Sequence, residues 1–595
     1  MPSKTSFECK KNHGKWPYRT VSTRRLTPLG ILWLFVWLLA SGAAYGQESG
    51  SIRGRIVADG GKPLADYGVH ISSGSAQSTS RSTTTDADGN FQFNNLSDRS
   101  YNISLSIQKG YILAGPVKLG NLRPGETVTI TMRKGGVITG RVTDPNGDPV
   151  AGISVSAIRI RNEEDKKINA SSSGFPRTTD DRGIYRLYGL QPGTYLIVAN
   201  GGQSFVAPVL SPFHGETPTY HPSSTRDTAA EVKVSSGGEA SGVDIRYRGE
   251  SGRTVSGKLS GAELALMNTS ASVSLRDAAT GVTAANTFVQ KSLGESTFAL
   301  QGVPDGEYEL EARYGNSESD EMFASEPRRI TVKGADISGL DLPMISLAIV
   351  YGRVSLEKSA SVCDPKRKIS FEEMSFFATY DERANAKPLS RRQVPYGSGS
   401  PNEQGDFKIP RLTPGRYRLT AGLRNETWFV KSISGPVISL SSRGVPVRSG
   451  VTAELSRSGL ALKAAERYSD VTVAVSDGGA TLQGKVAAKE GASLPSRLQV
   501  HLIPAEAAAA NELLRYAESR ASKTGEFGFR NIAPGKYFLL TRALPDSDEI
   551  ERQSNPLAWD AASRARLRKD AEAAKNEIEL KPCQRVKDLA LPNQM

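Results

Sequence analysis

The sequence predicts an all-β protein built as a tandem array of about five β-sandwich domains. The first observation behind this prediction is a unit in which an aromatic residue precedes a tyrosine by ten residues, with a turn between them. The second is a strand-like segment in which glycine is followed by arginine or lysine. Both patterns occur five times in the same order, and such self-similarity is the signature of repeated structural units.

Each aromatic-to-tyrosine unit has the pattern of two strands joined by a turn. Apolar residues alternate with others, as in Phe407-Lys408-Ile409, which is the period of a strand with one buried face. The turns carry Pro-Gly or Pro-Asp-Gly in four copies, and we expect type II turns there because Pro presets φ and Gly accepts positive φ. The tyrosine is expected to pack in the core and bond back to the backbone, as tyrosine corners do. The units are Phe91–Tyr101, Tyr185–Tyr195, Phe298–Tyr308, Phe407–Tyr417 and Phe527–Tyr537.

The glycine-containing segment precedes the aromatic residue of its unit by 37 to 55 residues. A glycine inside a strand marks a bulge or a close approach of another backbone. The basic residue that follows it is expected to face solvent and to protect an edge strand from pairing. The five pairs are Gly54-Arg55, Gly140-Arg141, Gly257-Lys258, Gly352-Arg353 and Gly484-Lys485.

Together the two patterns resemble the carboxypeptidase regulatory-like domain, which is a prealbumin-like (transthyretin-like) β-sandwich with Greek-key topology. The second repeat carries the resemblance best, in residues 142–152, 179–185 and 190–195. The resemblance covers most of residues 51–545. It implies a fold that occurs widely in secreted bacterial proteins, often in tandem, and it implies little about function.

The expected domain organisation is a leader followed by five sandwiches. A basic region ending in Arg24-Arg25 precedes a twelve-residue apolar core, 29–40, which is too short to span a bilayer comfortably. This is the pattern of a secretory signal peptide with a cut after Gly46, and an uncleaved N-terminal anchor is the alternative. The predicted ranges are 1–46 for the signal peptide and 47–134, 135–250, 251–345, 346–478 and 479–595 for the sandwiches. The short connections between repeats, such as 133–136, predict a beaded rod with limited bending.

Two helical inserts are expected in the fifth repeat. Residues 505–521 and 557–576 read as helices, with Leu513, Leu514 and Tyr516 as the larger apolar residues of the first, and Trp559 and Leu567 as anchors of the second. We expect such helices to cover the end of the sandwich, although amphipathic partner surfaces are the alternative.

The charge indicates no nucleic-acid partner. The chain carries a formal charge of +13, of which residues 1–46 contribute +6, so +7 remains for the sandwiches. That balance suits solubility or loose attraction to acidic surfaces, and no basic run is interleaved with aromatics. The partner is unknown from sequence; a polysaccharide or a cell-envelope protein is the expectation, with membrane contact only through an uncleaved leader.

Two segments invite a metal interpretation, and we predict no metal site in either. His214, Glu216 and His221 lie in one long segment, but no predicted helix or strand fixes their spacing, so an ordered crossover loop is the preferred interpretation. The run 86–90, Asp-Ala-Asp-Gly-Asn, lacks the later Glu and the oxygen spacing of a calcium loop and is interpreted as a turn.

No catalytic or cofactor-binding residue is predicted. The carboxypeptidases that lend the family its name hold zinc with a His-x-x-Glu element, which is missing at the histidines that follow the leader, so the resemblance covers only the accessory domain. Gly-x-x-x-x-Gly-Lys occurs at 252–258 and 479–485, but Leu259 and Val486 stand where a phosphate loop needs Ser or Thr. Paired carboxylates of a glycosidase have no sequence signature, so a hydrolase stays the second alternative.

Carbohydrate binding is the first alternative function. Sugar sites usually present aromatic rings, and only two tryptophans, Trp428 and Trp559, follow the leader. The loop aromatics Tyr220, Tyr380 and Tyr396 are the candidates, with isolated loop aromatics as the preferred interpretation. The leading hypothesis is an exported, non-enzymatic scaffold or adhesive protein built from these domains. Cys363 and Cys583 remain once Cys9 leaves with the leader, and an even pair in an exported chain permits a disulfide.

Overall fold

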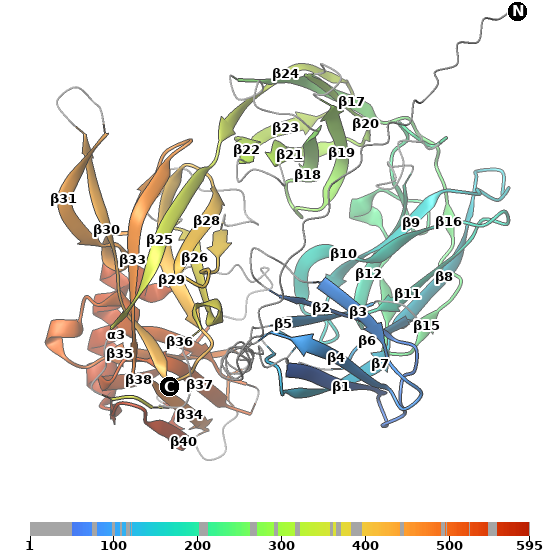
Figure 1. Cartoon of the computed structure of the whole chain (residues 1–595). Coiled ribbons are helices and arrows are strands. Elements are labelled where there is room, and N and C mark those ends of the chain that lie inside the picture. The colour runs from blue at the N-terminus through green and yellow to red at the C-terminus, as the bar shows by residue number, and fades with distance from the viewer. Residues whose placement is uncertain are drawn as a thin grey trace, which may run out of the picture.

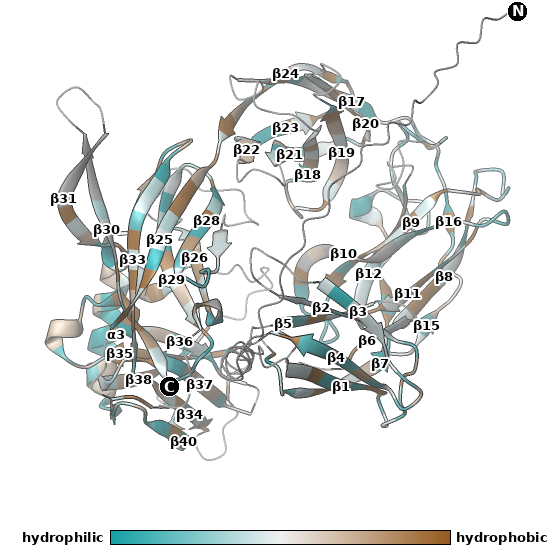
Figure 2. Ribbon diagram, viewed as in Figure 1, coloured by the Kyte–Doolittle hydropathy of each residue, from teal (hydrophilic) through white to brown (hydrophobic). Residues whose placement is uncertain are grey.

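The computed structural model is an all-β molecule of five sandwiches that follow one another along the chain (Figure 1). It describes residues 50–73, 80–97, 101–106, 110–114, 119–120, 122–200, 212–261, 270–290, 296–315, 322–357, 361–363, 370–381, 396–440, 446–488, 494–495, 497–522, 524–544 and 556–593. The predicted signal peptide, 1–46, lies outside these residues. Along the strands apolar and polar residues alternate, as the mixed brown and teal ribbons of Figure 2 show.

The first two sandwiches share one plan of two facing sheets. In the first, the sheets run β4-β1-β7-β6 and β3-β2-β5; in the second, they run β11-β8-β15 and β10-β9-β12-β13. The strands of the first are β1 (Gly50–Ala58), β2 (Gly68–Ser73), β3 (Ser80–Thr84), β4 (Asn90–Leu96), β5 (Tyr101–Leu105), β6 (Tyr111–Leu113) and β7 (Thr127–Lys134). The second has β8 (Gly136–Thr143), β9 (Ser154–Arg161), β10 (Lys167–Thr178), β11 (Ile184–Leu190), β12 (Gly193–Asn200), β13 (Thr219–Tyr220), the 3₁₀ turn η2 (Arg226–Thr228), β14 (Val232–Val234), β15 (Glu239–Ala240) and β16 (Ile245–Arg246).

The third and fourth sandwiches repeat the plan with additions. In the third, β22 pairs with both β21 and β24 and so links the two layers. Its strands are β17 (Arg253–Ser260), β18 (Ser270–Asp277), β19 (Thr283–Gln290), β20 (Thr297–Val303), β21 (Gly306–Gly315), β22 (Met322–Ser325), β23 (Arg328–Val332) and β24 (Ile337–Ser346). The fourth has β25 (Ala348–Glu357), η5 (Phe371–Glu373), β26 (Met374–Tyr380), β27 (Tyr396–Gly399), β28 (Asp406–Leu412), β29 (Gly415–Leu423), β30 (Trp428–Leu440), β31 (Pro446–Glu454), α2 (Leu455–Ser458), β32 (Leu460–Leu462) and β33 (Arg467–Asp477).

The fifth sandwich carries the helical inserts. Its sheets run β37-β34-β40 and β36-β35-β38-β39. Its elements are β34 (Ala480–Ala487), β35 (Leu498–Pro504), η6 (Ala507–Ala509), η7 (Leu513–Arg515), β36 (Ala517–Arg520), β37 (Glu526–Ile532), β38 (Gly535–Ala543), η8 (Leu557–Trp559), α3 (Ala561–Ala574), β39 (Glu577–Leu580) and β40 (Arg585–Pro592).

The strand that carries the glycine–basic pair is central in every sandwich. It pairs antiparallel with the strand of the first aromatic residue and parallel with the closing strand, as in β4-β1-β7, β20-β17-β24 and β37-β34-β40. The expectation that the basic residue protects an edge strand is therefore wrong. Arg55 and Arg141 instead donate from Nε to the backbone oxygens of Asp88 and Arg182, 3.0 Å in both, and so hold the turn before the aromatic strand.

Glycine is required in this strand because two neighbours occupy the place of a side chain. Each of the five glycines is paired with the first aromatic residue of its repeat, as Gly352 is with Phe407. A Cβ on Gly352 would lie 2.4 Å from the Phe407 ring and 2.6 Å from the backbone oxygen of Val471 in the closing strand. The predicted close approach is thus confirmed. Its cause is the ring of the first aromatic residue, which packs directly against the backbone of the strand glycine.

A polar side chain closes the turn that leads into the aromatic strand. Asp86, the first residue of the calcium-like run, accepts from the backbone nitrogens of Asp88 and Asn90 at 3.0 and 2.7 Å. Four of the five repeats show an equivalent contact to the residue four positions on, which makes this run a structural turn. The accepting residues are Asp86, Asp180, Asn402 and Ser522.

All five tyrosine corners form as predicted. Each hydroxyl donates to the backbone oxygen four residues upstream, as Tyr417 does to Thr413 at 2.9 Å and Tyr308 to Pro304 at 2.8 Å. The predicted type II geometry is wrong, however. Gly193, Gly415 and Gly535 have φ between 148° and 152° and open the following strand, whereas the third position of a type II turn needs φ near roughly +80°.

The two inserts of the fifth sandwich differ in their outcome. Residues 505–521 form two short 3₁₀ turns and β36 rather than the predicted helix. There Arg515 reaches Glu506 and the Tyr537 hydroxyl, which ties the segment to the corner. Residues 557–576 contain the predicted helix, whose Leu567 packs with Ile503 and Leu540 on the outer face of the sheet.

Candidate functional site

Specific contacts join the sandwiches at each junction between neighbours. Between the first and second, only Gly135 separates β7 from β8. Its nitrogen donates to Gly110 at 2.8 Å, and a Cβ there would lie 2.6 Å from the Cα of Gly189. Arg133 pairs with Glu163 across the junction at 3.2 Å. The two sandwiches therefore meet backbone to backbone.

The segment with His214, Glu216 and His221 forms part of the next junction. Glu216 forms an antiparallel bridge with Ser251. Burial, and to a lesser degree the Glu216 side chain, raises the pKa of Tyr247. His221 instead donates from Nδ1 to the backbone oxygen of Asp244 at 2.6 Å. Among the described residues, no three His, Cys, Asp or Glu side chains gather as metal ligands. The structure therefore places this segment as an ordered connector.

A small apolar cluster fixes the second sandwich against the third. Ile158, Leu196 and Val198 lie on the outer face of β9 and β12, and Tyr220 and Val282 pack onto them, the latter from the third sandwich. Burial raises the pKa of Tyr220 to about 12, with smaller effects from nearby charged residues.

An ion pair lies beside this cluster. Arg226 Nη1 is 2.8 Å from Asp277 Oδ1. Burial alone would raise the pKa of Asp277, but hydrogen bonds from Thr280 and Arg226 outweigh burial and hold the pKa below its usual value. The Asp277 carboxylate is thus ionised and forms part of the junction between the second and third sandwiches.

Two backbone hydrogen bonds hold the third sandwich against the fourth. Leu347 alone separates β24 from β25, and its nitrogen donates to Met322 at 2.9 Å. The loop before β33 adds a bond from the nitrogen of Ala465 to the oxygen of Ser346, 2.8 Å long. This connection, too, leaves no free linker.

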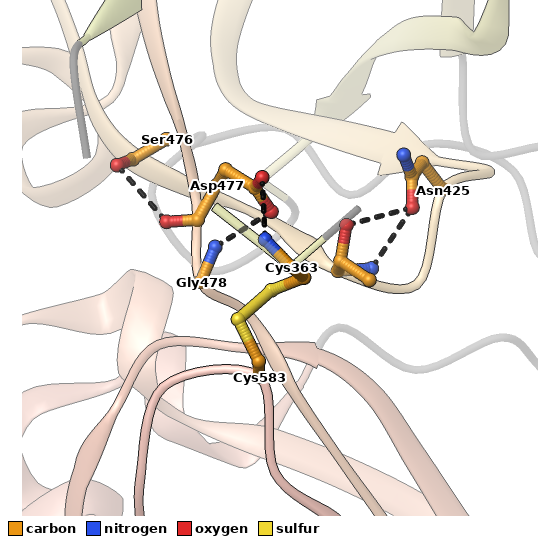
Figure 3. The surroundings of a disulfide bond; sticks show 7 residues. Cys363, Asn425, Ser476, Asp477, Gly478 and Cys583 are labelled. Carbon is orange, nitrogen blue, oxygen red and sulfur yellow. Dashed lines mark hydrogen bonds between the residues drawn. A yellow bond between two sulfur atoms is a disulfide. The ribbon is translucent and has the colours of Figure 1, made fainter. Parts of the chain in front are cut away.

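A disulfide joins the fourth sandwich to the fifth. Cys363 and Cys583, 220 residues apart, are bonded, so the hypothesis that they pair is confirmed. Figure 3 shows Asp477 beside the bond. Its carboxylate accepts from the nitrogen of Cys363 at 3.1 Å and from that of Gly478 at 2.8 Å, while the nitrogen of Cys583 donates to Gly478 at 3.0 Å.

Further contacts make these two sandwiches one unit. Asn531 of the fifth donates to the backbone oxygens of Asn425 and Trp428 at 2.6 and 2.8 Å. Leu514 packs against the core of the fourth sandwich. Trp559 lies under the Arg418 guanidinium, 6.0 Å from ring centroid to Cζ. Both inserts of the fifth sandwich, 505–521 and 557–576, therefore contribute to the junction.

An ion pair joins the first sandwich to the fourth. Arg123 Nη2, in the loop before β7, lies 2.6 Å from Glu373 Oε1 in η5, and the side chains are 24% and 10% exposed. In Figure 1 the five sandwiches accordingly follow a curve, with the blue and the orange ends turned toward each other. The expected beaded rod is wrong, because the array is curved and non-neighbouring sandwiches are in contact.

The proposed aromatic platform for sugars does not form from the predicted residues. Tyr380 and Trp428 are 5% exposed and belong to the core of the fourth sandwich. Tyr220 packs into the junction cluster and Trp559 beneath Arg418; the side chain of Tyr396 lies outside the described set. Among the tyrosines whose side chains are described, Tyr188 is exposed, at 37%, with Arg177 over its ring. The sequence could have indicated this, because Tyr188 is out of phase with the buried residues Tyr185 and Leu187 of β11.

The two Gly-x-x-x-x-Gly-Lys matches are strands. Gly257 lies within β17 and Gly484 within β34. A Cβ at these positions would meet the backbone oxygens of Leu340 and Leu589 at 2.1 and 2.5 Å. Because the closing strand covers both glycines, their amides do not cradle a phosphate.

Comparison with known proteins identifies the repeated domain. A family model described as carboxypeptidase regulatory-like domain matches residues 51–133 and 137–211. No curated protein matches the chain. Within the part of the chain that the structure describes, no helix has the length and apolarity to cross a membrane.

Three solved structures illustrate the likeness to other tandem β-domains. The chain is similar to GBS52, the minor pilin in the gram-positive pathogen Streptococcus agalactiae (15% identity, 33% of this chain and 96% of that chain, TM-score 0.18). It is also similar to the shaft pilin SpaA from Lactobacillus rhamnosus GG (11%, 34% and 98%, TM-score 0.17). The third is two B repeat units of the collagen binding protein of Staphylococcus aureus (11%, 72% and 100%, TM-score 0.13). The chain is a tandem array of β-sandwiches, and the carboxypeptidase regulatory-like domain model matches the first two of them.

Proposed function

We propose that this chain is an exported, non-enzymatic scaffold that holds five β-sandwiches in one fixed arrangement and presents their surfaces to a partner. The observation that carries the proposal is that every junction is locked by specific contacts. The disulfide between Cys363 and Cys583 is the strongest of these locks. A flexible tether would instead separate its domains by polar linkers without contacts across them.

Three of the four connections between neighbouring sandwiches are only one or two residues long. One residue lies between β7 and β8 and between β24 and β25, and two lie between β33 and β34. Strands thus pass almost directly from one sandwich into the next. Chain entropy favours hinge motion only where several residues are free to rotate, so these connections favour a rigid array.

Export is supported by the disulfide and by the predicted leader. Disulfides persist in oxidising compartments and are rare in the cytosol. The leader, 1–46, is a prediction from sequence and lies outside the described residues. Of the alternatives, no observation on the described residues favours a hydrolase; carbohydrate binding is taken up below.

Small-angle scattering of the chain from residue 47 on tests the proposal, because this piece retains every described residue. A rigid scaffold should give one curled particle shape that does not change between low and high salt. A profile typical of beads on a flexible string would contradict the scaffold. The matched control is the pair of variants Cys363→Ser and Cys583→Ser, which should loosen the link between the last two sandwiches only.

A further inference from the structure

A cleft on the first sandwich lies outside every junction described above. Its volume is about 720 Å³, and it opens on the outer face of the sheet β4-β1-β7. The turn into β4 closes one end. The cleft, called here the Arg53 cleft, is lined by Arg53, Gly54, Arg55, Thr84, Thr85, Asp86, Asn90, Phe91, Gln92, Thr127 and Thr129.

Strand alternation puts polar side chains from three strands in two short rows. On β1, Ile52, Gly54 and Ile56 face the core, so Arg53 and Arg55 face out. Arg53 is paired with Gln92 of β4 and Thr127 of β7. Arg55 is paired in the same way with Asn90 and Thr129. Each row therefore contains an amide, a guanidinium and a hydroxyl across neighbouring strands; Gln92 Nε2 donates one hydrogen to Asn94 Oδ1, which leaves its other hydrogen and its carbonyl oxygen for a ligand.

The charge of the cleft is positive, and one guanidinium is uncommitted. Arg55 is held by the backbone oxygen of Asp88. The Asp86 carboxylate accepts from the nitrogens of Asp88 and Asn90 and is fixed in the turn, so the lining carries two guanidinium charges against one carboxylate charge. Among the described residues, the Arg53 guanidinium has no hydrogen-bond or ion-pair partner, and Arg53 is exposed; its backbone nitrogen donates to the oxygen of Glu126 at 3.2 Å. A guanidinium with free donors suits a carboxylate, which it can bind through two parallel hydrogen bonds.

The arrangement is particular to the first sandwich. The residue before the strand glycine is Arg53 here and Thr139, Ser256, Tyr351 and Gln483 in the later repeats. The shared fold therefore does not require arginine at this place. Gln483 shows that glutamine occupies the same position of a folded repeat.

We propose that the Arg53 cleft binds an acidic polysaccharide, with a uronate carboxylate on Arg53 and sugar hydroxyls on Gln92 and Thr127. Amides and hydroxyls match the donors and acceptors of sugar rings, and the open sheet face accepts a chain that continues past the site. Charge complementarity selects a carboxylate-bearing polymer over a neutral one. The proposal does not depend on the scaffold function, since a flexible array would carry the same cleft.

Affinity electrophoresis tests the proposal with the chain from residue 47 on, in gels that contain polygalacturonate, alginate or neutral dextran. We expect the two acidic polymers to retard the protein and dextran not to. Arg53→Gln should weaken the apparent affinity for polygalacturonate about tenfold, the effect of one hydrogen bond to a charged group. Lys485→Gln removes the same charge from an exposed position of the fifth sandwich and should leave the affinity unchanged.

A second pair of variants tests the cleft without replacing Arg53. Thr127→Glu places a carboxylate beside Arg53 and should abolish retardation, whereas Thr131→Glu, on the same strand and outside the lining residues, should not. The proposal is overturned if no acidic polymer retards the chain, or if Arg53→Gln and Lys485→Gln weaken retardation equally, which would mean attraction by net charge. Equal affinity for polyglutamate or DNA would also overturn it, because the cleft would then recognise charge without sugar.

Discussion

His501 is the most deeply buried titratable histidine among the described residues, and its surroundings keep it neutral. It lies on β35, is 2% exposed, and has its Nδ1 3.6 Å from Glu518 Oε1. Burial, and to a lesser degree the charge of Arg542, lowers the pKa of His501 to about 4. Burial raises the pKa of Glu518, against opposing hydrogen bonds from Leu557 and Gln499.

This histidine should make the fifth sandwich sensitive to acid. The unfolded chain gains a proton on His501 near pH 6.5, whereas the folded chain does so only near pH 4, so stability is complete above pH 6.5 and is lost as pH falls toward 4. The loss approaches roughly 3 kcal/mol, offset in part by Glu518, whose raised pKa acts in the opposite sense. Urea unfolding followed by circular dichroism between pH 7 and 4.5 measures it.

His501→Gln should flatten this pH dependence, and His70→Gln, on the exposed face of β2, is the matched control. A slope that is unchanged in the His501 variant would show that other groups cause the acid sensitivity. The sequence offered no sign of this histidine's burial, because it sits between Val500 and Leu502, whose side chains face the opposite side of the strand.

At the scale of the element, the strand glycine is the feature with the sharpest test. A Cβ at Gly484 would lie 2.5 Å from the backbone oxygen of Leu589 and 2.8 Å from the Phe527 ring. Gly484→Ala should therefore destabilise the fifth sandwich by roughly 1 to 3 kcal/mol, as overpacking does. Gly528→Ala is the control, since its nearest neighbour would be 3.7 Å away. Thermal unfolding should show a lower melting temperature for the first variant; equal melting would contradict the role assigned to the glycine.

The aromatic-to-tyrosine unit could be predicted because it rests on residue types, whereas the bulge inside it could not. Each aromatic strand contains one residue with φ between 54° and 72°, six positions before the tyrosine, where the register with the central strand shifts. Asparagine, glycine and arginine all occupy this place, so composition gives no common signal. These residues are Asn95, Gly189, Gly302, Arg411 and Asn531.

For the whole molecule, the sandwiches were predictable and their arrangement was not. Periodicity reports which face of a strand is buried, and it therefore predicts repeats with separate cores. The contacts that bend the array join loops far apart in sequence, such as Cys363 with Cys583 and Arg123 with Glu373. Short linkers limit the angle between neighbours but leave its direction to these side chains. The sequence did not indicate the Arg53 cleft either. Its lining residues lie on β1, β4 and β7, which are far apart in sequence and become neighbours only through strand pairing.

The ion pair between the first and fourth sandwiches should decide whether the array stays curled. The Glu373 side chain is 10% exposed, so losing its ion pair with Arg123 weakens the stabilisation of a largely buried carboxylate, at a cost of about 1–3 kcal/mol. We expect Arg123→Glu to move the first sandwich away from the fourth, because two carboxylates would then face each other. Spin labels on exposed positions of β4 and β28 would report this as a longer and broader distance distribution.

The double variant Arg123→Glu with Glu373→Arg supplies the decisive control, because it restores opposite charges with their places exchanged. If the ion pair holds the curl, Glu373→Arg alone should open the array and the double variant should bring the distance back toward that of the original chain. Distances that stay the same in all three variants would mean that the junctions between neighbours suffice to set the curve. In that case the covalent link between Cys363 and Cys583 and the shared cluster around Tyr220 would carry the shape of the molecule without help from the first sandwich.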